Sequence, residues 1–178
     1  MPRRAAAARP PTAYQRALRR LARRDHSVEE LRRALLDRGH DVEEVEAAID
    51  RLRRERYVDD TGFAERFARS RMANQGHGRM RIRQDLRRRG VDRRTVEAGI
   101  AGALHEVDEK AVVDGLARRY WRQHAAVEPE KRLPRLWAFL VRRGFAPGLV
   151  RERLSRLWPK WSDALDGLEP VGDTGGVS

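Results

Sequence analysis

The chain has 178 residues, of which 37% are charged, 40% hydrophobic and 6% aromatic, and its formal net charge is +12. This composition supports several small helical cores better than one large core, so the length fits an array of small units. The absence of cysteine excludes a disulfide framework and a thiolate metal site, and no run approaches the ~20 apolar residues that span a bilayer.

The positive charge is concentrated beyond the first third of the chain. Residues 13–62 hold twelve basic and twelve acidic groups, whereas residues 63–100 hold eleven basic and four acidic groups. Residues 101–162 hold thirteen basic and seven acidic groups, and residues 163–178 carry four acidic groups. A field of this size favours a polyanionic partner, either nucleic acid or an acidic protein surface.

The chain begins with a basic arm, residues 1–12, which lacks the apolar stretch of an export signal and is predicted to be disordered. Residues 14–24 predict a short helix. Ser27, with an acidic residue three positions later, predicts the capped start of a second helix, and Asp41 with Glu44 predicts the same for a third.

The stretch from Phe63 to Gly90 predicts two helices joined by the connector Asn74-Gln75-Gly76-His77-Gly78. The acidic pair Asp59-Asp60 precedes the first of these helices and is interpreted as its cap. In the second helix, Ile82 and Leu86 lie four positions apart and face the core. Two rows of arginine flank this apolar seam: Arg83 and Arg87 on one side, and Arg81 and Arg88 on the other.

One pattern occurs three times along the chain, at spacings of 51 and then 54 residues. Each copy has two apolar residues on one helix, a glycine that ends this helix, and two apolar residues on the next helix. A period of this length indicates a repeat array in which neighbouring units cover one another. The matching positions are Leu31, Leu35, Gly39, Val45 and Ile49; Ile82, Leu86, Gly90, Val96 and Ile100; and Leu136, Leu140, Gly144, Val150 and Leu154.

We therefore predict an all-α fold, an elongated array of three tandem three-helix repeats. The repeats are expected at residues 13–56, 57–103 and 104–162, and their first helices at 14–24, 60–73 and 109–124. The acidic segment 163–178 has no period and is predicted to be a disordered tail.

The third copy contains all four tryptophans, at positions 121, 137, 158 and 161. One interpretation is a terminal repeat with a bulkier core, as repeat arrays require at their ends. The alternative is an aromatic surface on which nucleic-acid bases stack.

No motif in the chain indicates catalysis. The five histidines share no metal-ligand spacing, and neither a Walker phosphate loop nor a G-x-S-x-G nucleophile elbow is present. The sequence therefore predicts a binding protein that needs no cofactor or metal and is not an enzyme.

Two segments resemble the central repeat of the RecX family, which regulates the RecA recombinase. They are Y-V-D-D-x-x-F-A at residues 57–64 and R-x-x-x-x-G-H-G-x-x-R-I-R-Q-D-L-R-R-R-G-V at residues 71–91. The resemblance extends over roughly residues 14–160. It implies a curved helical array that docks in the groove of the RecA filament on single-stranded DNA. It further implies inhibition of ATP hydrolysis, strand exchange and coprotease activity, and hence a cytoplasmic, monomeric protein acting in homologous recombination, DNA repair and the SOS response.

The candidate contact surface for the RecA filament and its DNA lies in the middle repeat, where arginine is densest. Two other functions stay open: a sequence-specific helix-turn-helix DNA-binding protein, and a structural adaptor whose arginine content reflects genomic bias. The candidate contact residues are Arg71, Gly78, Arg79, Arg81, Arg83, Arg87 and Arg88.

Overall fold

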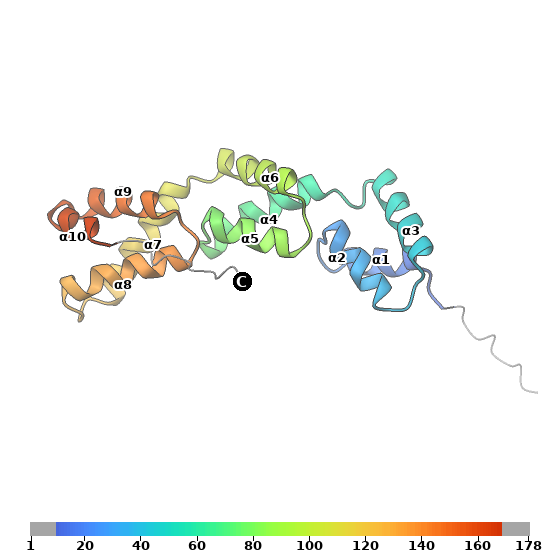
Figure 1. Ribbon diagram of the computed structural model, residues 1–178, viewed down its shortest axis with the longest axis horizontal. Helices are drawn as coiled ribbons and strands as arrows, with labels where there is room; N and C mark the ends of the chain where they lie inside the picture. Colours follow the sequence, from blue (N-terminus) through green and yellow to red (C-terminus); the bar gives the residue numbers. More distant parts are fainter. Residues whose placement is uncertain (1–9, 169–178) are drawn as a thin grey trace, which may run out of the picture.

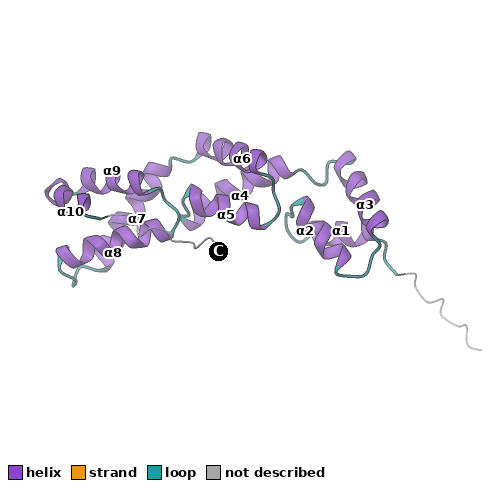
Figure 2. Cartoon of the chain, viewed as in Figure 1, coloured by secondary structure: helices purple, strands orange, loops and turns teal. Residues whose placement is uncertain are grey.

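The computed structural model describes residues 10–168, apart from the side chains of Trp161, Ser162 and Asp166. Every regular element of this part of the chain is a helix (Figure 2). Repeat 1 consists of α1 (Ala13–Leu21), α2 (Val28–Leu36) and α3 (Val42–Arg54); repeat 2 of α4 (Asp60–Gln75), α5 (Arg79–Arg88) and α6 (Arg93–Glu106); and repeat 3 of α7 (Glu109–Gln123), α8 (Pro129–Arg142) and α9 (Pro147–Leu157). A 3-10 turn at Pro159–Trp161 and α10 (Ser162–Asp166) follow.

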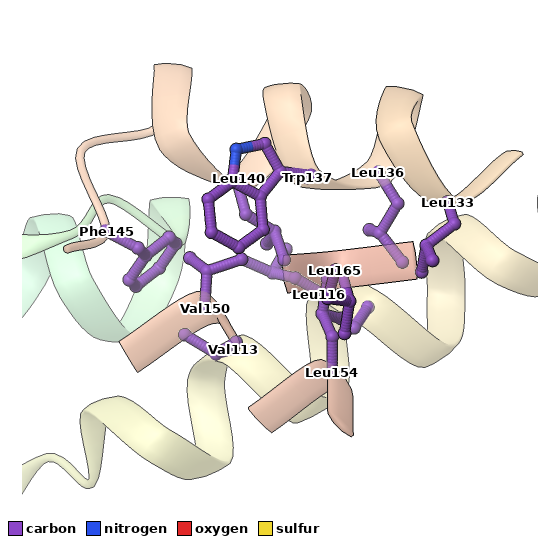
Figure 3. Packing of buried hydrophobic residues seen from close by; sticks show 11 residues of the cluster. Val113, Leu116, Leu133, Leu136, Trp137, Leu140, Phe145, Val150, Leu154 and Leu165 are labelled. Carbon is purple, nitrogen blue, oxygen red and sulfur yellow. The ribbon is translucent and has the colours of Figure 1, made fainter. Parts of the chain in front are cut away.

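The repeats lie in succession along an elongated molecule, and each has its own apolar core (Figure 1). All twelve apolar positions of the recurring pattern are at most 3% exposed. The predicted fold class is therefore confirmed. In repeat 3, α8 contributes Leu133, Leu136, Trp137 and Leu140 to the core, which also contains Phe145 and Val150 (Figure 3).

The glycine that follows each middle helix has the left-handed backbone conformation that favours this residue. The φ angles are +81° at Gly39, +78° at Gly90 and +86° at Gly144. In repeats 2 and 3 the next residue, Val91 or Phe145, donates its N–H to a carbonyl five positions earlier and is buried beneath the helix end. The same helix end thus recurs in each repeat.

Repeats 2 and 3 are joined where α8 ends and α5 begins, a contact that we name joint 2–3. The carbonyl oxygen of Arg143 accepts a hydrogen bond of 2.8 Å from the N–H of Gly78. The carbonyl oxygen of Gly144 accepts one of 3.0 Å from the N–H of Met80. A Cβ atom at Gly78 would lie 2.3 Å from the backbone of Gly144, so the two chains can approach this closely only because Gly78 has no side chain.

Joint 1–2, where α5 ends and α2 begins, repeats this arrangement. The carbonyl oxygen of Arg89 accepts a hydrogen bond of 2.5 Å from the hydroxyl of Ser27, the N-cap residue of α2. Ser27 and Gly78 are separated by the repeat spacing of 51 residues, so they hold equivalent places in the two joints. The middle helices consequently follow one another end to end in the order α8, α5, α2 (Figure 1).

An acidic side chain on the next repeat strengthens each joint. Asp60, the first residue of α4, accepts a 2.9 Å hydrogen bond from the N–H of Val28. Glu109, the first residue of α7, accepts a 3.2 Å hydrogen bond from the N–H of Arg79. Asp59 caps α4 as predicted, but the interpretation of Asp60 as a cap of its own helix is wrong, because its carboxylate binds the preceding repeat.

One helix boundary and one helix cap in repeat 1 differ from the prediction. Helix α1 ends at Leu21 rather than at residue 24. Asp41 stands at the N-cap of α3 but makes no side-chain capping hydrogen bond. Glu44 does not complete a capping box, because its carboxylate accepts the N–H of Ala13 at 2.8 Å and contacts His40.

The third repeat extends further than predicted. Leu165 of α10 is fully buried against the core of repeat 3, so the predicted tail cannot begin at Asp163. The predicted arm and the rest of the tail include residues 1–9 and 169–178, which lie outside the described part of the chain.

The tryptophans favour the core interpretation of repeat 3. Trp137 is 5% exposed, and the half-buried rings of Trp121 and Trp158 pack against the same core with their centroids 4.6 Å apart. The side chain of Trp161 lies outside the described structure.

We predict that Gly78→Ala lowers the free energy of unfolding by about 1–3 kcal/mol, because the added methyl group overlaps the Gly144 backbone and must force joint 2–3 apart. Gly115→Ala is the matched control, since a Cβ atom on this helical glycine would meet nothing within 4 Å. This control should be neutral or gain up to about 1 kcal/mol from helix propensity. Urea unfolding followed by circular dichroism measures both; equal stabilities for the two variants would contradict a tight joint 2–3.

Candidate functional site: an arginine-lined groove

A groove of about 620 Å³ lies where repeats 1 and 2 meet, and we name it the arginine groove. Seven of its lining residues are arginines, two are histidines and three are acidic, whereas only two are apolar. The groove thus has an excess of four positive charges without counting the histidines. Its lining residues are Arg20, Arg24, His26, Glu30, Arg33, Ala34, Asp37, Phe67, Arg71, His77, Arg81, Asp85, Arg88 and Arg89.

The groove's Glu30 is already occupied by partners within the protein. Its carboxylate pairs with Arg24 and Arg89 and accepts the N–H of Ser27. Burial alone would raise the pKa of Glu30, but the hydrogen bonds from Arg24 and Ser27 and the charge of Arg89 hold it below the usual value. Glu30 therefore stays ionised and offsets one of the two positive charges beside it.

The acidic residue Asp85 forms weaker ion pairs than Glu30. Its carboxylate lies 4.0 Å from Nε of Arg81 and 3.8 Å from a terminal nitrogen of Arg88, which are long ion-pair distances. The side chains of Arg81 and Arg88 are 46% and 68% exposed. Exposed pairs of this kind contribute little stability, so these guanidinium groups are available to an external anion.

The apolar part of the groove is covered by charge. The guanidinium carbons of Arg71 and Arg89 each lie 4.9 Å from the centre of the Phe67 ring. Cation–π contacts of this geometry hold both arginines in place and leave little apolar surface for a partner.

The structure brings Arg71, Arg81 and Arg88 together in the groove, as members of the predicted contact surface. Arg87 is exposed on the same helix and has no ion pair within the described residues. Arg83 lies apart, because its guanidinium group donates to both carboxylate oxygens of Glu97 on α6, at 2.5 and 2.8 Å.

The two remaining predicted residues lie at joint 2–3. Arg79 is 3.4 Å from the carboxylate of Glu109. Gly78 is buried against Gly144, so the backbone that it allows to approach belongs to repeat 3 of the same chain. Gly78 is the N-cap residue of α5, and its contact with Gly144 fixes where this helix begins.

Sequence reasoning missed the contribution of repeat 1, whose Arg20, Arg24 and Arg33 also line the groove. The equal numbers of acidic and basic residues in this repeat concealed them. The signal that could have found them is the repeat spacing, because Arg20 lies 51 residues before Arg71.

Two equivalent histidines, His26 and His77, also line the groove and are separated by the same 51 residues. The Nδ1 atom of each is buried and makes no hydrogen bond within the described part of the chain. Burial lowers the pKa of His26, and Arg24 adds to the effect; burial also lowers the pKa of His77, with further contributions from Arg81 and Arg71. Both imidazoles are therefore neutral at physiological pH.

Within residues 10–168, no helix is long and apolar enough to cross a membrane, and no group of three or more potential ligands could hold a metal ion. The geometry of the groove is suited to binding a polyanion.

Profiles of one protein family match the chain in three consecutive segments. They are described as the first, second and third three-helix domains of RecX, and they match residues 13–52, 59–100 and 108–154. Together these segments cover most of the chain and coincide with the three repeats.

Several curated proteins named "Regulatory protein RecX" are similar to the chain. The protein from Halorhodospira halophila is 40% identical over 140 residues, which are 76% of this chain and 81% of that protein. The protein from Thermobifida fusca is 37% identical over 155 residues, 83% of each chain. The protein from Xanthomonas axonopodis pv. citri is 37% identical over 140 residues, 79% of this chain and 84% of that protein.

Two solved structures share the fold. The crystal structure of RecX from Lactobacillus salivarius superposes with a TM-score of 0.72 at 18% identity, over 82% of this chain and 94% of that one. A second structure, titled "Crystal structure of regulatory protein RecX", gives a TM-score of 0.69 at 23% identity, over 80% of this chain and 71% of that one.

The lowered pKa values of His26 and His77 predict that stability decreases with acidification. The unfolded chain binds protons near the ordinary pKa of 6.5, whereas the folded chain does not until the pH is lower. The free energy of unfolding should therefore fall between about pH 7 and 5.5, by at most ~1.4 kcal/mol per pH unit for each histidine.

Urea unfolding across this pH range measures the effect, and the double substitution His26→Gln and His77→Gln should flatten the slope. The carboxylates titrate mainly at lower pH. An identical slope in the double variant would show that these histidines are not responsible.

Proposed function

The chain belongs to the RecX family of regulatory proteins, and on this premise we propose that it regulates RecA by binding the filament of RecA on single-stranded DNA. The proposed site of binding is the helical groove of that filament. Binding there would inhibit RecA's ATP hydrolysis, strand exchange and coprotease activity. The protein acts as a monomer, in the cytoplasm, and its part is to bind rather than to catalyse.

The observation that carries this proposal is the arginine groove on an elongated array of repeats. An elongated basic surface complements a helical polymer that contains nucleic acid better than it complements a small ligand. The same surface combines guanidinium groups from two repeats, so a partner that fills the groove contacts repeats 1 and 2 together.

The contact surface that we propose is centred on α5. Arg81, Arg87 and Arg88 are exposed on this helix, and Arg71 continues the surface across the groove. Arg83 and Arg79 form its edges, where Glu97 and Glu109 hold them. Gly78 contributes by fixing the start of α5.

A second candidate function, direct binding to nucleic acid without RecA, is favoured by one observation. The groove's lining has only two apolar side chains, Ala34 and Phe67, and arginines cover the second. Interfaces with nucleic acid are more polar and more positively charged than interfaces between proteins. Binding to random single-stranded and double-stranded DNA without RecA would distinguish the two functions.

We predict that the double reversal Arg87→Glu and Arg88→Glu weakens inhibition of RecA ATPase on single-stranded DNA. Both residues are exposed, and the reversal breaks no short ion pair in the described structure. If the target is DNA phosphate, each lost contact should flatten the log–log dependence of affinity on salt by roughly 0.7–0.9. If the target is carboxylates of RecA, filament binding should fall while affinity for bare DNA changes little.

The matched control is Arg93→Glu with Arg94→Glu, which makes the same change of charge at two exposed positions of α6 in the same repeat. It should retain inhibition, because neither residue lines the arginine groove. Equal inhibition by the two double variants, both with the wild-type melting temperature, would remove α5 from the binding surface.

A further inference from the structure

The two joints between repeats join equivalent helix ends but carry different charges. The repeat spacings place Arg143 of joint 2–3 where joint 1–2 has Arg89, 54 residues earlier. They place Arg81 where joint 1–2 has Glu30, 51 residues earlier. An acid–arginine pair in one joint is thus replaced by two arginines in the other.

In joint 1–2 this place is filled by an internal anion. The carboxylate of Glu30 pairs with the guanidinium group of Arg89, which lies next to the end of α5. The pair is partly buried, because Arg89 and Glu30 are 27% and 19% exposed. Joint 1–2 therefore contains its own counter-ion.

In joint 2–3 the corresponding arginine has no carboxylate partner among the described residues. The guanidinium group of Arg143 instead donates to the carbonyl oxygens of Gln75 and Gly76, at 2.7 and 3.3 Å. The backbone of Arg81 lies directly against Gly144, since a Cβ atom on that glycine would be 2.4 Å from the N atom of Arg81. The joint thus holds the backbone of Arg81 against the residue that follows Arg143, and the two charges act on one another.

Burial lowers the pKa of Arg143, and the two neighbouring positive charges of Arg81 and Arg119 lower it further. His77, in the connector before α5, is also affected by the charges of Arg81, Arg71 and Arg143. The carboxylate of Asp85, whose charge partly offsets the lowering of the pKa of His77, is 4.0 Å from Arg81.

We propose that joint 2–3 is a phosphate-binding site, in which a phosphate group of a nucleic-acid backbone occupies the place that Glu30 holds in joint 1–2. Arg81 and Arg143 are its ligands, and Arg119 adds positive charge beside them. Guanidinium groups bind phosphate oxygens through paired, charge-assisted hydrogen bonds. The inference rests on the proposed function only for the source of the phosphate, the DNA strand of the filament.

A polymer of phosphates fits the surroundings better than a protein carboxylate. Arg81 belongs both to this joint and to the arginine groove, which continues through Arg71 and Arg88 toward repeat 1. A strand with a regularly repeated negative charge can follow this path. A protein partner would need an apolar centre, and Met80 is the one exposed large apolar side chain at this joint in the described structure.

The deciding variant is Arg81→Glu, which places in joint 2–3 the acid–arginine pair of joint 1–2. The new carboxylate should pair with Arg143, raise the midpoint of thermal unfolding and occupy the phosphate site. The variant is to be compared with Arg81→Gln, which removes one charge without filling the site. The control is Arg54→Glu, a reversal at an exposed position of α3 that belongs to neither joint.

Affinity for a fluorescein-labelled oligothymidylate, without RecA, is measured over a range of salt concentrations. The slope of the log–log plot should fall by roughly 0.7 for Arg81→Gln and roughly 1.4 for Arg81→Glu, since the second variant also removes Arg143 from the phosphate. Arg54→Glu should change the slope by less than either. A slope for Arg81→Glu equal to that of Arg54→Glu, or a lowered midpoint of unfolding, would overturn the proposal.

Two further outcomes separate the possible partners and the two proposals. If oligoglutamate of matched charge competes as well as the oligothymidylate, and Arg81→Glu abolishes only binding of oligoglutamate, the site binds protein carboxylates and the phosphate proposal fails. RecA ATPase is assayed separately. If the two Arg81 variants change the salt slopes as expected but the wild-type protein does not inhibit RecA ATPase, the phosphate site is supported and the proposed function is contradicted.

Discussion

The end-to-end contact of the middle helices determines how the whole molecule is arranged. The end of one helix presents unpaired carbonyl groups and the start of the next presents unpaired N–H groups. At joint 2–3 each satisfies the other, whereas at joint 1–2 the carbonyl of Arg89 accepts from the hydroxyl of Ser27 instead. The helix dipoles favour the same order, since the negative end of α8 meets the positive end of α5. The contact needs a glycine at the left-handed turn, because only there can the chain turn away and leave its carbonyl groups exposed to the neighbouring helix.

Most of the repeat architecture could be predicted from the sequence, because its determinants are local. Leu86 and Ile100 are recognisable by helical spacing, and Gly90 by its place after the last apolar residue. The partners of Asp60 and Glu109 could not be predicted, since a carboxylate at a helix start has the same appearance whether it caps its own helix or binds the preceding repeat. The contacts between repeats are tertiary, and the residue spacing within one repeat does not predict them.

Only part of the candidate site could be predicted from the sequence, because the residues that line it come from two repeats. Counting charges along the chain found the arginines of α5, where acidic residues are few, but not those of repeat 1. In that repeat the acidic side chains are engaged: Glu29 pairs with Arg32 and Arg33, and Glu30 with Arg24 and Arg89. Net charge per segment therefore does not show that the arginines of a balanced segment gather at the groove in the folded structure.

The two joints also differ in what holds them, and the difference explains how the protein tolerates two adjacent arginines. Joint 1–2 depends on side chains, through the Ser27 hydroxyl and the pair of Glu30 with Arg89. Joint 2–3 has two backbone hydrogen bonds and a glycine–glycine contact that needs no side chain. Because these backbone contacts require only that Gly78 and Gly144 lack side chains, the neighbouring positions Arg81 and Arg143 can carry charges that repel one another. A repulsion that would weaken joint 1–2 can therefore be kept in joint 2–3, where an external anion relieves it, and binding and stability become coupled at the junction between repeats 2 and 3.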